Sequence, residues 1–368
     1  MTMDNIEQFK SAKSAIAKKY VKSSNATALY QTLSTFIPYF VLFTLAVEST
    51  SISYWLTAAL IVLQVLFLMR VFMMMHDCGH DSLFNTAIYN KIVGFIMGVL
   101  CGIPQYVWSK HHAYHHSTNG NWNKYRGPLS VLSVHEFAQL SDKKKNSYQK
   151  SRNILMAPLG GFMYFIFNPR YTWIKGSLDF AVYFVSTRFK NNDLTMQEIT
   201  QSFTTKYWSS WKEYRHMTGN NIVLLTSVAV ASWYFGWLTF LPLYVITISI
   251  SGALGIILFS IQHNFEGSYA SGDENWDYYT AALEGTSYLT LPKILHWFTA
   301  DIGYHHVHHL LSKIPNYKLV ECHEEYAHLF TSVKRIKLSD TAEAFKFILW
   351  DSDERKMISI AQFEEKYL

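Results

Sequence analysis

The sequence predicts an all-α integral membrane protein, with four transmembrane helices in two hairpins and a cytoplasmic helical lobe. The first observation is composition: 49% of the 368 residues are hydrophobic and only 16% are charged, which is too apolar for an ordinary soluble domain of this length. The second is that four apolar stretches approach the roughly 20 residues that a bilayer crossing needs. The third is that positive charge gathers on one side of both hairpins, which orients the chain.

Each pair of expected spans is joined by a tight turn. The four spans are residues 32–47, 54–75, 222–240 and 241–261. The first pair turns at residues 48–51, and the second turns near Gly236 and Pro242. Two further apolar stretches, residues 92–107 and 154–167, are shorter and carry glycine and proline, so we expect them to be interfacial or re-entrant. A six-span arrangement, in which both of these stretches cross the bilayer, stays open.

Lysines orient the chain in the membrane. Neither hairpin turn contains Lys or Arg, whereas the N-terminal segment and the central lobe are rich in lysine. The positive-inside rule therefore places both termini and the lobe in the cytoplasm. We expect a cytoplasmic segment at residues 1–29, a membrane domain at residues 30–330 and a second cytoplasmic segment at residues 331–368. The polar N-terminus carries no recognisable cleavable signal, and three scattered cysteines predict no disulfide framework.

Histidine is concentrated near the ends of the apolar stretches. Imidazoles at positions i, i+3 and i+4 lie on one face of a helix, so each cluster can direct its rings to a common point. Eight or nine nitrogen ligands exceed the four of a zinc ion and suit two octahedral iron ions that keep positions open. The cytoplasmic lobe is thus expected to carry a di-iron histidine site. The candidate ligands are His76, His80, His112, His115, His116, His263, His305, His308 and His309.

Other residues near these clusters have less certain roles. His111 and His306 neighbour the candidate ligands, and the sequence leaves open whether they contact metal. Cys78 lies about 100° or more from the helix face of His76 and His80, so we expect it not to be a ligand. Acidic side chains should orient the imidazoles, with simple solvation of a helix end as the alternative. The candidates for this role are Asp77, Asp81, Glu266 and Asp301.

The order and spacing of these histidines resemble the membrane fatty acid desaturase family, with its HxxxH, HxxHH and HxxHH boxes. The resemblance runs from about Tyr30 to about Glu325. Outside the boxes, Trp276-Asp277 and Ile314-Pro315-Asn316-Tyr317 look like acyl-lipid desaturases of the Δ12 (omega-6) type, with the bacterial members most similar. The resemblance implies that the nine candidate histidines hold two iron ions, in an enzyme of the bacterial cytoplasmic membrane whose active site faces the cytoplasm.

This resemblance implies O2-dependent insertion of a cis double bond into an acyl chain, at the Δ12 position of a lipid-linked monounsaturated chain. The substrate is an acyl-lipid or an acyl-CoA in the surrounding membrane lipid. The first box lacks the wider spacing of the acyl-CoA branch, and Phe259 stands where that branch has asparagine. These departures imply either that water completes the coordination of one iron or that the substrate is a lipid-bound acyl chain.

Electrons should come from an external ferredoxin or cytochrome, because the chain shows no fused haem or flavin motif. It also shows no nucleic-acid motif. A basic surface could receive the donor, although membrane topology alone also explains its charge. The candidate residues are Lys143, Lys144, Lys145, Lys150 and Arg152.

Two alternative functions stay open at this stage. A hydroxylase or ketolase of the same di-iron architecture, acting on a lipid, sterol or carotenoid, would begin with the same hydrogen abstraction. A membrane zinc-binding protein without redox chemistry is less well supported, because zinc needs only three or four protein ligands and most of the clusters would have no role.

Overall fold

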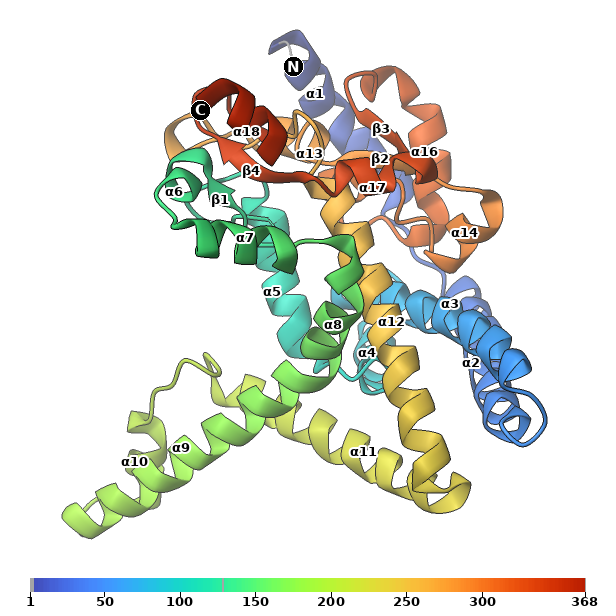
Figure 1. Cartoon of the computed structure of the whole chain (residues 1–368), viewed down its shortest axis with the longest axis vertical. Helices are drawn as coiled ribbons and strands as arrows, with labels where there is room; N and C mark the ends of the chain where they lie inside the picture. The colour runs from blue at the N-terminus through green and yellow to red at the C-terminus, as the bar shows by residue number, and fades with distance from the viewer. Residues whose placement is uncertain (1–2, 128, 368) are drawn as a thin grey trace.

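The computed structural model describes residues 3–127 and 129–367, which are mostly helical (Figure 1). The first helices are α1 (Met3–Tyr20), α2 (Asn25–Ser49), α3 (Tyr54–Gly79), α4 (Ala87–Leu100), α5 (Gln105–Thr118), α6 (Val134–Ala138), α7 (Asp142–Ser151), α8 (Ala157–Phe162) and α9 (Asn168–Lys190). They are followed by α10 (Met196–Ser202), α11 (Trp211–Phe235), α12 (Trp237–His263), α13 (Tyr278–Leu283), α14 (Lys293–Phe298), α15 (His305–Leu310), α16 (Leu319–Glu325), α17 (Thr341–Ala344) and α18 (Ile360–Tyr367). A π-helical segment, η2 (Met163–Phe167), joins α8 to α9.

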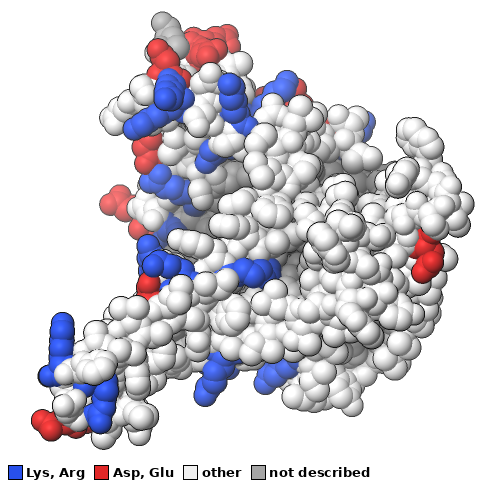
Figure 2. Space-filling model, turned by 60° about the horizontal axis from the view of Figure 1, so that its bottom comes forward, with Lys and Arg blue, Asp and Glu red and all other residues white. Residues whose placement is uncertain are grey.

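Three helices have the length and composition to cross a membrane, namely α2, α3 and α12. Serine side chains cap the first two: Ser24 accepts a hydrogen bond from the backbone N–H of Thr27, and Ser53 accepts one from Leu56. Such caps satisfy N–H groups that have no partner within the helix. Figure 2 shows a broad surface that is almost free of charged side chains on the side where α2 and α3 lie, apart from one acidic patch at its right edge, and most charged side chains gather toward the opposite side. This surface is suited to lipid.

The predicted span at residues 222–240 differs from the helices that the structure shows. Gly236, at φ +84°, ends α11 at Phe235 and separates it from α12. The first half of α11 is polar, so its apolar part is shorter than the roughly 20 residues that a crossing needs. The described residues therefore include three candidate spans rather than the predicted four, or up to four if the bent pair α4–α5 counts as one.

The two shorter apolar stretches lie in bent or packed segments. A 101° bend separates α4 from α5 and brings the histidines of α5 toward the end of α3. The segment formed by α8 and η2 packs along α12 (Figure 1). Glycines allow this close packing, because a Cβ atom on Gly252 would lie 2.7 Å from the Cα of Gly161. The structure thus holds both stretches against α12 or α3.

The lobe is not purely helical, so the all-α prediction is corrected here. Strands β1 (Leu132–Ser133), β4 (Phe347–Asp351) and β5 (Lys356–Ser359) form one sheet in the order β1-β4-β5, and β2 (Ser287–Thr290) pairs in parallel with β3 (Lys334–Lys337). Each strand has five residues or fewer, and β1 and β4 pair in parallel across a long sequence separation. Strands this short carry little period-2 signal.

The C-terminal sheet covers one side of the lobe. The indole rings of Trp122 and Trp350 stack with centroids 4.3 Å apart, and Phe137 packs edge-on against Phe363. Both chain ends lie at the top of Figure 1 with the strands, whereas the α2–α3 and α11–α12 turns lie at the bottom. The predicted division at residues 29 and 330 stays a prediction, although residues 334–359 supply strands to both sheets.

Candidate metal centre

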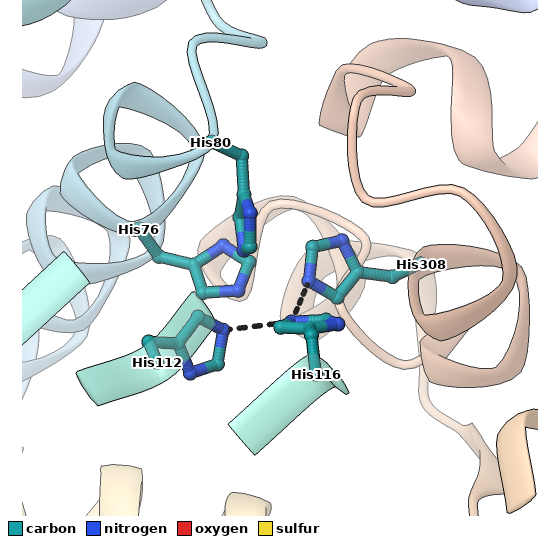
Figure 3. A group of neighbouring side chains, drawn as sticks. All are labelled: His76, His80, His112, His116 and His308. Carbon is teal, nitrogen blue, oxygen red and sulfur yellow. Dashed lines mark hydrogen bonds between the residues drawn. The ribbon is translucent and has the colours of Figure 1, made fainter. Parts of the chain in front are cut away.

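A first group of five histidines converges at the C-terminal end of α3 (Figure 3). His76 lies in the last turn of α3, and His80 caps that helix. His112 and His116 lie one turn apart on α5, and His308 comes from α15. One ring nitrogen of each lies within 4.8 Å of the corresponding nitrogens of the others.

A second group of four histidines lies beside the first. It comprises His115 of α5, His263 at the end of α12, and His305 and His309, one turn apart on α15. The rings of His116 and His309 stack with centroids 4.1 Å apart and join the two groups. Helices α5 and α15 thus each serve both groups, because the i+3 and i+4 positions diverge enough to face two centres. The nine predicted residues are the nine that the structure gathers.

The spacing of the ring nitrogens fits metal ions. The Nε2 atoms of His112 and His116 are 2.9 Å apart, those of His116 and His308 are 3.0 Å apart, and those of His263 and His305 are 3.0 Å apart. Two nitrogens about 2.1 Å from one ion lie about 3.0 Å apart if they subtend a right angle, as in an octahedron, and about 3.4 Å apart in a tetrahedron. These three distances are close to the value for two ligands at a right angle, and the candidate ligand nitrogens of each group lie within 4.8 Å of one another.

Several buried ring nitrogens have no protein partner, which also fits a metal site. Nε2 of His76, His80 and His309 and both nitrogens of His115 make no hydrogen bond within the described chain. Buried polar atoms without a partner are unfavourable unless a water or an ion satisfies them. Burial, and then neighbouring histidines, lower the pKa of His305, His308 and His309 well below its usual value. These imidazoles are therefore neutral at physiological pH, the form that binds metal.

Two of the nine imidazole rings, those of His76 and His263, have a hydrogen-bond partner other than a histidine that fixes their orientation. Nδ1 of His76 lies 3.0 Å from Oδ1 of Asp77, and Oδ2 of Asp77 accepts hydrogen bonds from the backbone N–H and side-chain amide of Asn316, each at 2.9 Å. Nδ1 of His263 lies 3.2 Å from the carbonyl oxygen of Gly285. The prediction for Asp77 is thus confirmed, and a backbone carbonyl holds His263.

The other three predicted acidic partners point elsewhere. Within the described ranges, none of them pairs with any of the nine histidines. Asp81 is exposed, and Glu266 lies 3.8 Å from Lys334. Asp301 lies 3.7 Å from His296, and burial raises the pKa of its carboxyl group to about 6 despite the nearby Arg70. These three residues lie close to the histidine boxes in the sequence, but adjacent side chains near the end of a helix point in different directions. Closeness in sequence therefore did not identify the partners of the histidines.

An apolar pocket of about 410 Å³ borders both histidine groups. Its walls come from α3, α5, α12 and the segment of α8 and η2, and it reaches His112 and His115. The sequence analysis named no residue for this pocket, because aromatic residues in spans also pack in cores or face lipid. Its apolar lining includes Phe72, Trp108, Tyr164, Phe165, Ile256 and Phe259.

Comparison with known proteins identifies the family to which a chain with this arrangement of histidines belongs. The family profile described as "Fatty acid desaturase" matches residues 53–335, which is most of the chain. The chain belongs to the fatty acid desaturase family. A relative named fatty acid desaturase, from Bacillus subtilis (strain 168), is 37% identical over 341 residues, covering 92% of this chain and 88% of that protein. The chain is therefore a membrane desaturase, as the resemblance of its histidine boxes implied.

More distant relatives of this desaturase have more specific names. The sn-1 acyl-lipid omega-3 desaturase (ferredoxin) of Synechocystis is 23% identical, covering 68% of this chain and 61% of that protein. The acyl-lipid omega-3 desaturase (cytochrome b5) of the Arabidopsis thaliana endoplasmic reticulum is 24% identical, covering 70% of this chain and 60% of that protein. These proteins are thus named for lipid-bound substrates and for two different electron donors.

Two histidines whose roles were left open lie outside both groups of the desaturase. His111 is exposed and lines the apolar pocket. His306 is fully buried, and its Nε2 lies 2.9 Å from Nδ1 of His323. Cys78 packs in the apolar core beside α4 and belongs to neither group. His323 was missed from the sequence, because its partnership with His306 joins two segments that no spacing pattern relates.

Proposed function

We propose that this desaturase inserts a cis double bond into the acyl chain of a membrane lipid, in an O2-dependent reaction at two iron ions. The observation that carries the proposal is the apolar pocket of about 410 Å³ that ends at His112 of the five-histidine group and at His115 of the four-histidine group. A pocket of this volume is in the range that holds a small ligand or an extended acyl segment. The reacting carbons would lie beside both groups.

The chain's own residues have three tasks in this reaction. Five neutral imidazoles would hold one ion and four would hold the other, and Asp77 would orient His76. When bound, the irons supply the oxygen chemistry that removes two hydrogens from an unactivated methylene pair, which no side chain performs. Phe72, Trp108 and Phe259 line the acyl side of the site and exclude water from it.

A lipid-bound substrate is supported by the position of the pocket. Two of its walls belong to the candidate spans α3 and α12, so an acyl tail already in the bilayer lies at the right depth. We propose a monounsaturated chain and a new bond near carbon 12, on the strength of the sequence around Trp276-Asp277 and Ile314-Pro315-Asn316-Tyr317. Several relatives are named omega-3 desaturases, so the omega-3 position is the second candidate for the new double bond.

The proposed topology has two hairpins, α2–α3 and α11–α12, in which only the apolar second half of α11 enters the membrane, with the site on the cytoplasmic side of a bacterial inner membrane. The absence of Lys and Arg from both turns and the lysines of α7 support this orientation. An external ferredoxin or cytochrome would then supply electrons from the cytoplasm. Lys143, Lys144 and Lys150 are exposed and make no ion pair within the described chain, so they are proposed to receive an acidic donor.

Product analysis with purified protein tests the proposal. The iron-loaded protein, ferredoxin and a reductant are supplied with dioleoyl phospholipid or with oleoyl-CoA, and double bonds are mapped by mass spectrometry. A dienoic chain in the phospholipid with its new bond near carbon 12 is the expected result. Turnover of oleoyl-CoA alone would overturn the lipid-bound substrate, and another bond position would overturn Δ12 only. A hydroxylated product, or zinc in place of two irons, would overturn the reaction itself.

A further inference from the structure

A second, much smaller pocket shares Tyr125 with the acyl pocket. Its volume is about 30 Å³, and its lining includes His263 of the four-histidine group. Tyr125 lines both pockets, and its ring centroid lies 4.8 Å from that of His115. The second pocket extends to Arg126, which is exposed. We call it the polar pocket.

The polar pocket has the size and chemistry of a water site. A cavity needs about 10–15 Å³ of such volume to hold one water molecule, together with polar partners for it. Asn264 lines the pocket and is only 3% exposed, yet its Nδ2 has no hydrogen-bond partner within the described residues. By contrast, Ser268 and Asn119, which also line it, donate to backbone carbonyls. The unpartnered amide therefore marks where a water would bind.

Backbone geometry keeps this pocket open beside the histidine. Asn264 directly follows His263 and caps α12, so its side chain is fixed next to the four-histidine group. The loop opposite carries Gly127 at φ +76°, where an added Cβ would lie 3.1 Å from Oδ1 of Asn264. A larger residue at Gly127 would be strained and would press on the amide.

The reaction itself requires an aqueous connection, and this step rests on the proposed function. One turnover converts –CH2–CH2– and O2 into –CH=CH– and two water molecules. O2 accepts four electrons, of which two come from the broken C–H bonds and two from the electron donor. The C–H bonds release two protons, so two more must come from solvent when the donor supplies electrons alone. The apolar lining of the acyl pocket is unsuited to carry them.

We propose that the polar pocket is the route by which protons reach the four-histidine group and product water leaves it. Asn264 holds the water of this route, and Tyr125 separates it from the acyl chain. Substrate and water thus reach the histidines through two pockets that share one tyrosine, the first at His112 and His115 and the second at His263. Asn264 acts as a positioning residue for water and contacts neither the substrate nor the nine histidine rings in this scheme.

The experiment compares two ways of closing the pocket in the full-length, iron-loaded protein. Asn264→Leu removes the amide at nearly constant volume, and Asn264→Ser restores a polar group. Val131→Ile adds one methyl group at a buried residue of the lining, and Val134→Ile makes the same change at an equally buried residue outside it. Three quantities are measured: iron per chain, the association rate of azide with the oxidised protein, and the rate of double-bond formation.

Asn264→Leu and Val131→Ile should bind normal iron but take up azide more slowly than the parent protein. Both should lower the desaturation rate about tenfold, well within the 100-fold or more that positioned proton transfer contributes, whereas Asn264→Ser and Val134→Ile stay close to the parent protein in both measurements. Unchanged azide uptake in Val131→Ile would overturn the proposal, including when Asn264→Leu fails to retain iron. A parent protein that binds iron and azide without desaturating would overturn the proposed function instead.

Discussion

Two sets of buried histidines in this desaturase show how the same residue type serves different ends. In the nine-histidine site, ring nitrogens from α3, α5, α12 and α15 converge, and several have no protein partner. In the pair formed by His306 and His323, one ring nitrogen of each faces the other at 2.9 Å. Phe330 packs on both rings of this pair. Both sets are buried, and Nδ1 of His306 also has no hydrogen-bond partner among the described residues, so it is the convergence of several ring nitrogens on one point that distinguishes a metal site from a structural pair.

The largest expected effect tests the first set. Replacing His80, His115, His263 or His308 by Ala should abolish product formation, because each change removes a metal ligand and even the loss of a supporting residue typically lowers metal affinity or activity about 10–100-fold. Iron analysis of the membrane-inserted variants, alongside product analysis, checks this expectation. Desaturation retained in two of the four variants would remove the distinction between the sets.

An intermediate effect is expected from the residue that orients His76. Asp77→Asn should lower iron content or activity about 10–100-fold, because it weakens the contact that fixes the ring. Asp81→Asn is the matched control, since Asp81 lies four residues further along the chain and is exposed. Iron retention during dialysis against a chelator measures the difference. Equal retention by the two variants would show that convergence alone orients the rings.

The smallest effect is expected in the second set. His306→Phe should keep iron and activity but lower the free energy of unfolding by about 1–3 kcal/mol, because Nδ1 of His323 is left without its partner. The double variant His306→Phe/His323→Phe should be closer to the parent protein, since both polar partners are removed. Thermal unfolding of the purified proteins compares them. Iron loss in His306→Phe at full folding would place His306 in the metal site.

Much of this site could be predicted from the sequence. Eight of the nine histidines follow from helical spacing, whereas His263 stands alone and was assigned through the resemblance to the family. The turn was expected near Gly236 and Pro242; the structure places it at Gly236, and Pro242 lies inside α12. The division into five and four could not be predicted, because it depends on the angle at which α5 meets α15. The directions of Asp81, Glu266 and Asp301 depend on backbone turns beyond helix ends, where Asp81 and Asp301 adopt positive φ values of 54° and 55°.

The fold was predictable where local pattern dominates and unpredictable where distant segments meet. Helices α2, α3 and α12 contain the apolar runs read from the sequence. The sheets were missed, because Leu132 pairs with Leu349 and neither strand is long enough to show alternation. The polar pocket was missed for the same reason, since it forms between the loop at Gly127, the end of α12 and Met357.

The position of Met357 has a consequence for how the protein is made. All nine histidines leave the ribosome before β4 and β5 do, and the sheet that these strands complete closes one side of the polar pocket. During synthesis the histidine helices can therefore assemble while Met357 is still absent. We expect this unfinished lobe to be the stage at which metal ions enter most easily. In the finished chain, Met357 lines the polar pocket, whose volume is only about 30 Å³.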